Sequence, residues 1–493
     1  MRSVSRGLAA TVAAGVLLVG SAGPAAAGSV ADPVAPAACA APVPSTTQAG
    51  YTVADPNCDF GTGAPFVALT NAAGRPISRV CTGIRDGAAC GIEVPLHWTG
   101  DLAIFAHGFR GSGTTVWVDS PNLRAFHVQQ GFAWAASSYQ TNGYDVGQGV
   151  TDSHALIALF RQVVGRSARH VYMTGASMGG HITAVAIEHF RHDFVGAMPY
   201  CGVLGDVRLF DFYLDVNVAA AALTHAPITF PLPPPADVIA RYIALVQAEL
   251  PLLGTTFGHG APPVLTPLGQ EWADAVQQRS GGTRPGFAGA FAFWTSLPSI
   301  PPVSSALPFH FGLYPGLNGG TAGIATGNVT SNRATVYQLD GDPRLSPAER
   351  ALNRDVLRVA ATARASRDLT GVPRVAGDPR IPVLSLHDIG DLFVPLSMEQ
   401  VYGVRVALHG QSRLFVSRAI RGVGHCDFTL PELQAGFSDL VRWVRTGHRP
   451  AGDAILDARR VAKPTFGCRF TQGVRPNFVA PPCPARDGAS EDL

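Results

Sequence analysis

The sequence predicts an α/β protein whose mostly parallel sheet is flanked by helices. Short, continuously apolar runs recur along the chain, and segments with the 3.6-residue period of helices lie between them. Continuously apolar runs suit strands that are buried on both faces, and strand–helix–strand alternation is typical of a parallel sheet. The composition fits a large buried core, because 46% of the 493 residues are hydrophobic and only 15% are charged.

The predicted elements alternate over most of the chain. The apolar runs expected to form strands begin at Leu102, Phe132, His170, Phe194, Ile381 and Arg413. Helical patterns begin at Asp152, Gly179 and Leu396. A last helix is expected up to about Val444, because Thr429 and Glu432 have the spacing of a capping box and apolar residues follow on one side.

The alternation breaks between residues 203 and 378, a segment rich in proline, glycine and aromatic residues. We interpret it as an inserted lid with helices over Asp237–Leu250 and Ser346–Ala363. Its aromatic loops either line an apolar substrate cleft or pack the insertion's own small core. The predicted division of the chain is 47–202 and 379–448 for the two parts of the core, 203–378 for the insertion and 449–493 for a C-terminal extension.

The amino terminus has the pattern of a secretory signal peptide. Arg2 and Arg6 precede an apolar run from Leu8 to Val19, and small residues favour cleavage after Ala27. Residues 1–27 are therefore expected to be removed, with an extended leader over 28–46. The apolar run is too short to cross a bilayer, which predicts a secreted protein without a stable membrane anchor.

The charge pattern argues against polyanionic partners. The formal net charge is +2, and the lysines and arginines are dispersed along the chain. Binding to nucleic acid or to an anionic membrane surface is therefore not expected.

Eight cysteines follow the predicted cleavage site, and an even number in an exported chain favours disulfides. No pair has the CxxC spacing of a zinc site. Proximity in sequence makes Cys39 with Cys58, Cys81 with Cys90, and Cys468 with Cys483 the simplest pairs. Cys201 and Cys426 are then left for each other.

The stretch "GASMGG" predicts a catalytic nucleophile. It has the G-x-S-x-G pattern, follows an apolar strand and opens a helix, which is the setting of a nucleophile elbow. Ser177 is the candidate nucleophile. Gly175 and Gly179 are expected where a side chain would collide with neighbouring backbone.

A serine nucleophile needs a base and a group that orients the base, and both follow in the sequence. Asp391 lies in "GDLFVP" just after a predicted strand, and His425 lies in "GVGHC" after the next one. Serine, aspartate, histidine is the chain order expected for such an elbow. Asp388 and Asp427 are alternatives for the acid.

The tetrahedral intermediate needs two hydrogen-bond donors, for which we expect the backbone N–H groups of Phe109 and Met178. Phe109 follows "HG" at the end of the strand that begins at Leu102, and Met178 follows the nucleophile. Gly108 is an alternative to Phe109. His107 is expected to be structural.

Together, "GASMGG", "HGF", "GDLFVP" and "GVGHC" resemble the α/β-hydrolase superfamily, in particular its secreted esterase, lipase and polyester-hydrolase branches. The similarity covers about residues 100 to 445 without the insertion. It implies the α/β-hydrolase fold, a triad of Ser177, Asp391 and His425, and a lid between the sixth and seventh core strands. It also implies that neither a metal nor an organic cofactor takes part.

A second resemblance is to feruloyl esterases and tannases. These carry a cysteine directly after the catalytic histidine, bonded to one directly before the serine. Here Cys426 follows His425, but Ala176 precedes Ser177. Cys201, at the end of a predicted strand, is the candidate partner in its place, and the bond would hold His425 in position.

These observations predict a secreted serine hydrolase of carboxylic esters. The apolar insertion favours hydrophobic, aromatic or polymeric ester substrates. Two alternatives remain from the sequence: an amidase or aminopeptidase with the same triad, and a non-catalytic binding protein that keeps the fold.

Overall fold

A central sheet organises the described part of the chain. The computed structural model describes residues 39–484 except 60, 233–236, 300–306 and 318–324, so the predicted signal peptide and residues 28–38 lie outside it. Within this part the sheet has eight strands in the order β15-β14-β11-β10-β7-β9-β6-β5. Their bounds are β5 Ser78–Arg85, β6 Ala88–Pro95, β7 Asp101–Ala106, β9 Ala133–Ser137, β10 His170–Ala176, β11 Gly196–Tyr200, β14 Val383–Asp388 and β15 Phe415–Ile420.

The sheet is mostly parallel, as predicted. Between neighbouring strands of this sheet, only the pairings of β6 with β5 and with β9 are antiparallel. Each of the six predicted apolar runs contributes a strand. The hairpin of β5 and β6 extends the sheet beyond those predictions.

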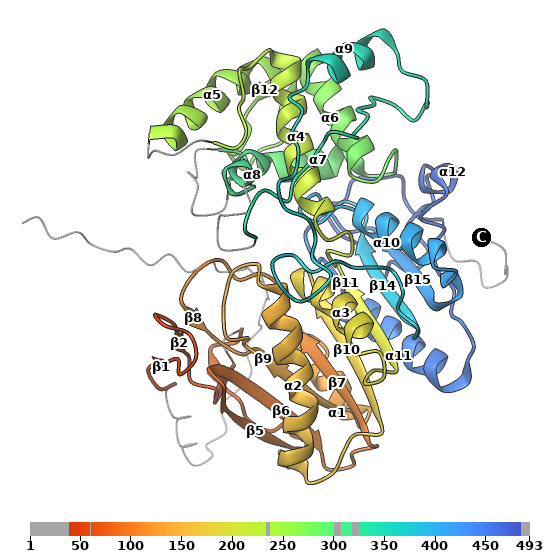
Figure 1. Ribbon diagram of the computed structural model, residues 1–493. Coiled ribbons are helices and arrows are strands. Elements are labelled where there is room, and N and C mark those ends of the chain that lie inside the picture. Colours follow the sequence, from red (N-terminus) through yellow and green to blue (C-terminus); the bar gives the residue numbers. More distant parts are fainter. Residues whose placement is uncertain (1–38, 60, 233–236, 300–306, 318–324, 485–493) are drawn as a thin grey trace, which may run out of the picture. The chain divides into compact units, whose positions relative to one another are not determined.

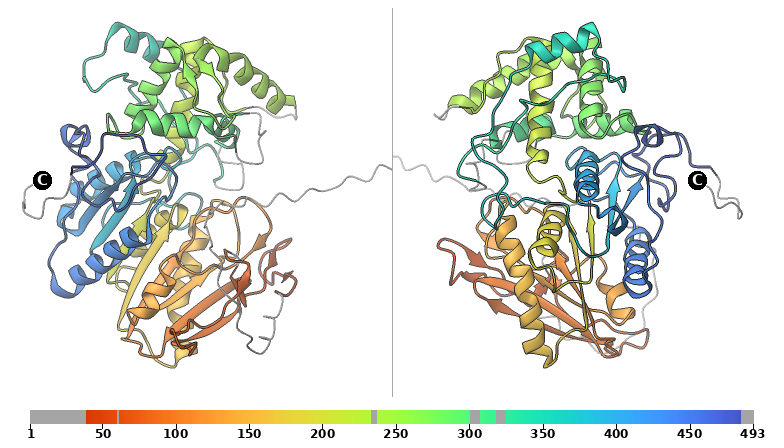
Figure 2. Two further views of the ribbon diagram at one scale, coloured as in Figure 1. Left: turned by 180° about the vertical axis from the view of Figure 1, so that it is seen from behind. Right: turned by 45° about the vertical axis from the view of Figure 1, so that its right-hand side comes forward.

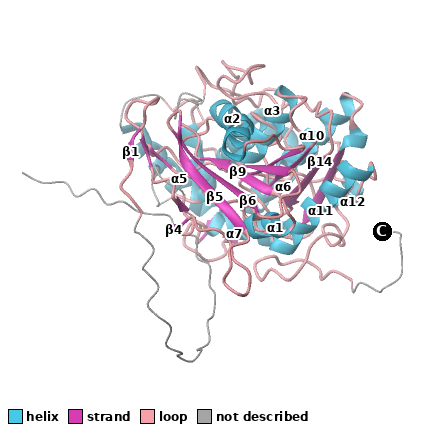
Figure 3. Cartoon of the chain, turned by 90° about the horizontal axis from the view of Figure 1, so that it is seen from below, coloured by secondary structure: helices cyan, strands magenta, loops and turns pink. Residues whose placement is uncertain are grey.

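Helices cover both faces of the sheet (Figure 3). α2 (Val146–Val164), α3 (Met178–His189) and α10 (Ser397–Leu408) lie on one face, and α1 (Arg124–Gln129) and α11 (Leu430–Thr446) lie on the other. Alternate residues of β7 divide between two core clusters: Leu102 and Ile104 pack in the cluster of α2 and α3, whereas Ala103 and Phe105 pack in that of α1 and α11. This is why the strands are apolar at every position.

The predicted capping box is present at the start of α11. The Thr429 side chain accepts from the Glu432 N–H, and the Glu432 carboxylate accepts from the Thr429 N–H. Because these bonds satisfy donors that have no partner within the helix, they fix where the helix begins. Gly447 ends it in the left-handed conformation.

The chain between β11 and β14, the sixth and seventh strands in sequence, forms a separate helical layer. It lies beyond the ends of the strands (Figures 1 and 2). Its elements are α4 Arg208–Thr224, α5 Asp237–Leu253, β12 Gly254–Thr255, β13 Val264–Leu265, α6 Pro267–Arg279, α7 Phe287–Ser296, α8 Phe309–Leu313, the 3-10 turn Tyr314–Gly316 and α9 Pro347–Asp355.

The helix predicted to run to Ala363 ends earlier, at Asp355. Val356 is extended, and the next residues bond to the segment of Asn328 and Asn332 instead of continuing the helix. The Val359 N–H donates to the Asn332 side chain at 2.7 Å, and the Thr362 N–H donates to the Asn328 carbonyl at 2.8 Å. These non-local bonds compete with the helix and end it.

Three disulfides join Cys39 with Cys58, Cys201 with Cys426, and Cys468 with Cys483. The expected bond between Cys81 and Cys90 is wrong, because both cysteines are free. In the β5–β6 ladder Cys81 faces Ile92, whereas Cys90 faces Gly83. Cys90 is therefore two residues from the partner of Cys81, a diagonal position at which Cα atoms lie about 7–8 Å apart. A disulfide does not span this distance without movement of the backbone.

Short elements complete the described chain. They are β1 Val43–Pro44, β2 Thr52–Val53, β3 Cys58–Asp59, β4 Ala64–Pro65, β8 Thr115–Val116, the 3-10 turn Ser412–Leu414 and α12 Ala458–Val461. Of the helices in the described ranges, none has both the length and the hydropathy needed to cross a membrane.

Candidate active site

Ser177 occupies a sharp turn between β10 and α3. Its φ is 59° and its ψ is −121°, a conformation that is costly for a residue with a side chain. Hydrogen bonds on both sides hold the turn: the Ser177 N–H donates to the Tyr200 carbonyl at 3.2 Å, and the Ser177 carbonyl accepts from Gly180 at 2.9 Å. The turn thus fixes the direction of the serine side chain.

The two glycines of the motif are required by close backbone contacts. A Cβ at Gly175 would lie 2.2 Å from the Gly179 carbonyl oxygen, and one at Gly179 would lie 2.0 Å from that of Ala106. Both contacts are with backbone atoms, which cannot move aside as a flexible side chain can. The G-x-S-x-G pattern therefore follows from the packing of the turn.

The structure brings Ser177, His425 and Asp391 into one hydrogen-bonded chain. His425 Nε2 lies 2.8 Å from Ser177 Oγ, and His425 Nδ1 lies 2.6 Å from Asp391 Oδ2. The imidazole is half-buried and the carboxylate is fully buried. Such a chain can move a proton from the serine hydroxyl to the imidazole while the carboxylate fixes the ring.

Asp391 lies in a tight turn that is held by its own carboxylate. Its Oδ1 accepts from the backbone N–H groups of Phe393 at 2.8 Å and Val394 at 3.0 Å, which leaves Oδ2 for His425. We call residues 388–394 the acid loop and residues 421–428 the histidine loop. Bonds to both oxygens fix the orientation of the carboxylate toward the imidazole.

The two alternative acids, Asp388 and Asp427, have other partners than His425. Asp388 Oδ2 accepts from the Asp427 N–H at 2.8 Å, and its other oxygen has no partner among the described residues. Burial, reinforced by the charges of Asp391 and Asp427, raises the pKa of Asp388 well above its usual range. The Asp427 carboxylate lies 3.5 Å from Arg475 Nε.

The loop of His107, Gly108 and Phe109 lies against the serine. A Cβ at Gly108 would lie 3.0 Å from Ser177 Cβ, so a larger residue here would crowd the serine. The His107 ring lies with Nδ1 2.7 Å from the Gly108 carbonyl oxygen. Since a trans peptide points its N–H opposite to its carbonyl, the Phe109 N–H is directed away from the His107 ring.

Met178, the second expected donor, is the first residue of α3. The first four N–H groups of a helix have no intrahelical acceptor, and the positive end of the helix dipole lies there. An oxygen that gains negative charge beside Ser177 would be stabilised at this position.

The ring of His107 is a buried structural element. It stacks on Tyr139 with the ring centroids 3.9 Å apart, and its Nε2 lies 3.1 Å from the Ser138 carbonyl oxygen. Burial, together with the charge of Arg110, lowers the pKa of His107 well below its usual value. The neutral ring orients the neighbouring peptide.

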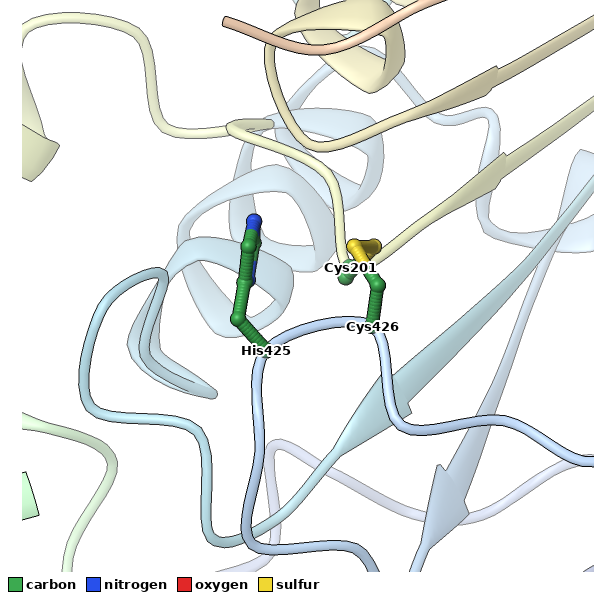
Figure 4. Close-up of side chains that lie close together, drawn as sticks. All are labelled: Cys201, His425 and Cys426. Atoms are coloured by element: carbon green, nitrogen blue, oxygen red, sulfur yellow. A yellow bond between two sulfur atoms is a disulfide. The ribbon is translucent and has the colours of Figure 1, made fainter. Parts of the chain in front are cut away.

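The disulfide between Cys201 and Cys426 links the end of β11 to the residue after His425 (Figure 4). Cys201 directly follows Tyr200, whose carbonyl accepts from Ser177. The bond therefore joins the histidine loop to the strand that holds the serine turn. Although both sulfurs lie close to His425, they cannot act as metal ligands, because each is consumed in the disulfide.

One aromatic side chain contacts His425, and two aromatic side chains of the insertion contact that one. Phe393 lies edge-on to the imidazole with a centroid distance of 5.0 Å. Tyr213 and Phe309, from the insertion, contact Phe393 at 6.0 and 5.2 Å. Two buried aromatic side chains of the insertion therefore support the ring that contacts His425.

The sequence did not reveal the insertion residues that bond to the acid loop, namely Tyr213, Arg284, Trp294 and His310. Their donors reach carbonyl groups far away in sequence. No local pattern marks such contacts.

No protein-family model matches the chain. A curated protein, the o-phthalyl amidase of Xanthobacter agilis, is 35% identical over 77 residues, which are 16% of this chain and 17% of the amidase. The chain is thus similar to less than a fifth of that relative's length.

Several solved structures are similar to this chain. Feruloyl esterase B from Aspergillus oryzae is 14% identical with a TM-score of 0.38, and the match covers 78% of this chain and 86% of that one. Tannin acyl hydrolase from Aspergillus niger is 13% identical with a TM-score of 0.43 over 75% and 79%. The acylaminoacyl peptidase of Pyrococcus horikoshii is 10% identical with a TM-score of 0.36 over 77% and 44%.

These structures thus include a feruloyl esterase and a tannin acyl hydrolase. The mixed α/β fold itself follows from this chain's own strand order and from the helices on both faces of its sheet.

Proposed function

We propose that this protein is a serine hydrolase that cleaves carboxylic esters through an acyl-enzyme on Ser177. The observation that carries the proposal is the unbroken hydrogen-bonded chain from Ser177 Oγ through His425 to Asp391, at 2.8 and 2.6 Å. A serine, a base and an orienting acid at these distances match the requirements of nucleophilic acyl transfer.

In the first half of the reaction, Ser177 Oγ attacks the ester carbonyl carbon and His425 Nε2 takes the serine proton. The imidazolium then donates that proton to the leaving alcohol as the tetrahedral intermediate collapses to the acyl-enzyme. Asp391 Oδ2 holds the Nδ1–H tautomer and stabilises the imidazolium. In the second half, His425 Nε2 takes a proton from a water molecule as the water oxygen attacks the acyl carbon. The imidazolium then returns this proton to Ser177 Oγ as the bond between Oγ and the acyl carbon breaks and the carboxylic acid leaves.

The negative charge of the tetrahedral intermediate falls on the former carbonyl oxygen. We assign its stabilisation to the backbone N–H groups of Phe109 and Met178. The orientation of the Phe109 peptide and the position of Met178 at the start of α3 support this assignment.

The insertion, as a lid over the site, favours hydrophobic or aromatic esters in this proposal, either small or polymeric. Phe393 lies beside the imidazole, and Tyr213 and Phe309 of the insertion pack against Phe393. Apolar surface of this kind binds acyl or alcohol groups that carry rings or alkyl chains. We further propose secretion, since disulfides persist in oxidising compartments.

A second candidate function is amide hydrolysis. The 77-residue similarity to an o-phthalyl amidase favours it, and the same triad can protonate an amine leaving group. Amide and ester hydrolysis would share every residue named above, so substrate trials must separate them.

The test is a panel of nitrophenyl esters with acyl chains of rising length, beside amino-acid nitroanilides. The proposal predicts ester hydrolysis that Ser177→Ala lowers by about four or more orders of magnitude. Ser412→Ala, at an exposed serine away from the site, should keep wild-type rates. Faster hydrolysis of the anilides would favour the amidase. Inactivity of the purified protein toward every substrate would favour the binding protein.

A further inference from the structure

The acid loop receives hydrogen bonds from four side chains of the insertion. Arg284 Nε donates to the Ile389 carbonyl at 2.6 Å, and Trp294 Nε1 donates to that of Gly390 at 3.0 Å. His310 Nε2 lies 2.8 Å from the Leu392 carbonyl, and the Tyr213 hydroxyl donates to that of Phe393 at 2.8 Å. We call these four side chains the clamp.

The clamp residues come from separate elements of the insertion. Tyr213 lies on α4, Trp294 on α7 and His310 on α8, while Arg284 lies between α6 and α7. All four are at least nine-tenths buried. Removing such a donor would leave a buried carbonyl without a partner, which is costly, so these bonds resist opening.

Trp294 contacts both catalytic loops. Besides the Gly390 carbonyl, its Nε1 lies 2.8 Å from the Val423 carbonyl, two residues before His425. The loops also bond directly, since the Gly390 N–H donates to the Gly422 carbonyl at 2.9 Å. One indole N–H therefore spans the gap between the segments that carry Asp391 and His425.

Helix α7 is also packed tightly against this junction. A Cβ at Gly390 would lie 2.6 Å from the Gly422 carbonyl oxygen and 3.2 Å from Ala290 Cβ. Ala290 lies one helical turn before Trp294. Helix α7 thus packs against the acid loop at the point where that loop meets the histidine loop.

We infer that the insertion is a fixed clamp on the catalytic loops, and that Trp294 is the positioning residue that sets the distance between Asp391 and His425. This inference rests on the proposed function for its consequence in catalysis. A cover that swung open as one piece would have to break all four bonds to the acid loop, so we expect substrate to enter while the clamp stays in place.

The other groups that face this junction are consistent with a preformed site. Burial lowers the pKa of Arg284 to about 9, and the carboxylate of Asp391 acts in the opposite direction. The guanidinium therefore stays charged at neutral pH. Burial lowers the pKa of His310 to about 4, so this ring is neutral.

The test compares Trp294→Phe with a matched control, Trp272→Phe. Each variant keeps an aromatic ring and removes one buried indole N–H of the insertion. Trp272 Nε1 donates at 2.9 Å to the carbonyl of Val216, away from the catalytic loops. Val216 lies within α4, so its carbonyl keeps an intrahelical donor and Trp272→Phe should lose less stability than Trp294→Phe. The pH–rate profile, which a loss of stability alone would not move, therefore reports positioning.

For Trp294→Phe we expect kcat on a nitrophenyl ester to fall about 10- to 100-fold with little change in KM, because small displacements of catalytic groups have effects of this size. The acid limb of the pH–rate profile should move to lower pH, since a more distant Asp391 stabilises the imidazolium less. Trp272→Phe should keep the wild-type kcat and acid limb. Equal behaviour of the two variants would overturn the inference.

A titration of the His425 ring by NMR gives a readout independent of activity, with the signal assigned by its loss in His425→Gln. The inference predicts a lower pKa of His425 in Trp294→Phe than in Trp272→Phe, even if the wild-type protein hydrolyses nothing. Identical titrations would overturn it. If Trp294→Phe does not fold, Tyr213→Phe takes its place, because the Tyr213 hydroxyl also donates to the acid loop. Its control is Tyr314→Phe, since the Tyr314 hydroxyl of the wild type donates to the Thr229 carbonyl instead.

Discussion

Cys201 and Cys426 form a disulfide across 225 positions of sequence, and it joins the strand beside the Ser177 turn to the residue after His425. The nucleophile and the base belong to segments that are otherwise far apart in the chain. The bond limits how far these segments can separate in both the folded and the unfolded protein.

Replacing both cysteines, in Cys201→Ala/Cys426→Ala, should destabilise the protein by about 2–5 kcal/mol and also lower kcat. The loss of kcat follows because the backbone of the histidine loop is no longer tied to β11. The measurements are urea unfolding and steady-state kinetics. The double variant of Cys468 and Cys483 is the control, and it should lose stability but keep kcat. If both double variants kept the wild-type kcat, the bond would have no positioning role.

Asp391→Asn should lower kcat by about 10⁴-fold, because an amide cannot stabilise the imidazolium or hold the required tautomer. Asp388→Asn should have little effect on kcat. Its raised pKa indicates a protonated acid, and an asparagine of the same shape can still accept from the Asp427 N–H. The reverse pattern in steady-state kinetics would assign the acid to Asp388.

We expect the buried carboxyl group of Glu249 to make the stability of the insertion depend on pH. This carboxyl is 2% exposed, and burial raises its pKa to about 8. A raised folded-state pKa means that the stability from the neutral form is complete below the unfolded-state pKa. That stability is lost as the pH rises through the folded-state value. The urea midpoint of the wild type should therefore fall more between about pH 5 and about pH 9 than that of Glu249→Gln. Parallel curves for the two proteins would contradict this.

The sequence predicted the parallel strands because each is buried on both faces and is therefore apolar throughout. It missed β5 and β6, where glycines and arginines interrupt the apolar pattern and where β5 is partly exposed at the edge of the sheet. It also missed α4, which is buried on nearly all sides and so lacks the one-sided period that marks a surface helix.

Local patterns also explain why Ser177, Asp391 and His425 could be proposed from sequence: each lies in a turn whose glycines and strand ends are visible in the chain. The clamp could not be predicted in the same way. Trp294 is separated by 96 residues from Gly390 and by 129 from Val423, and only the folded insertion brings its indole to those carbonyls.

The most direct test of the triad is covalent labelling of the folded, purified protein with a fluorophosphonate probe, followed by peptide mass spectrometry. The account predicts one adduct on the peptide that contains Ser177. The adduct should be absent in Ser177→Ala and should form far more slowly in His425→Gln, because the hydroxyl then lacks its base. A folded wild-type protein that gains no adduct at Ser177 would contradict the account.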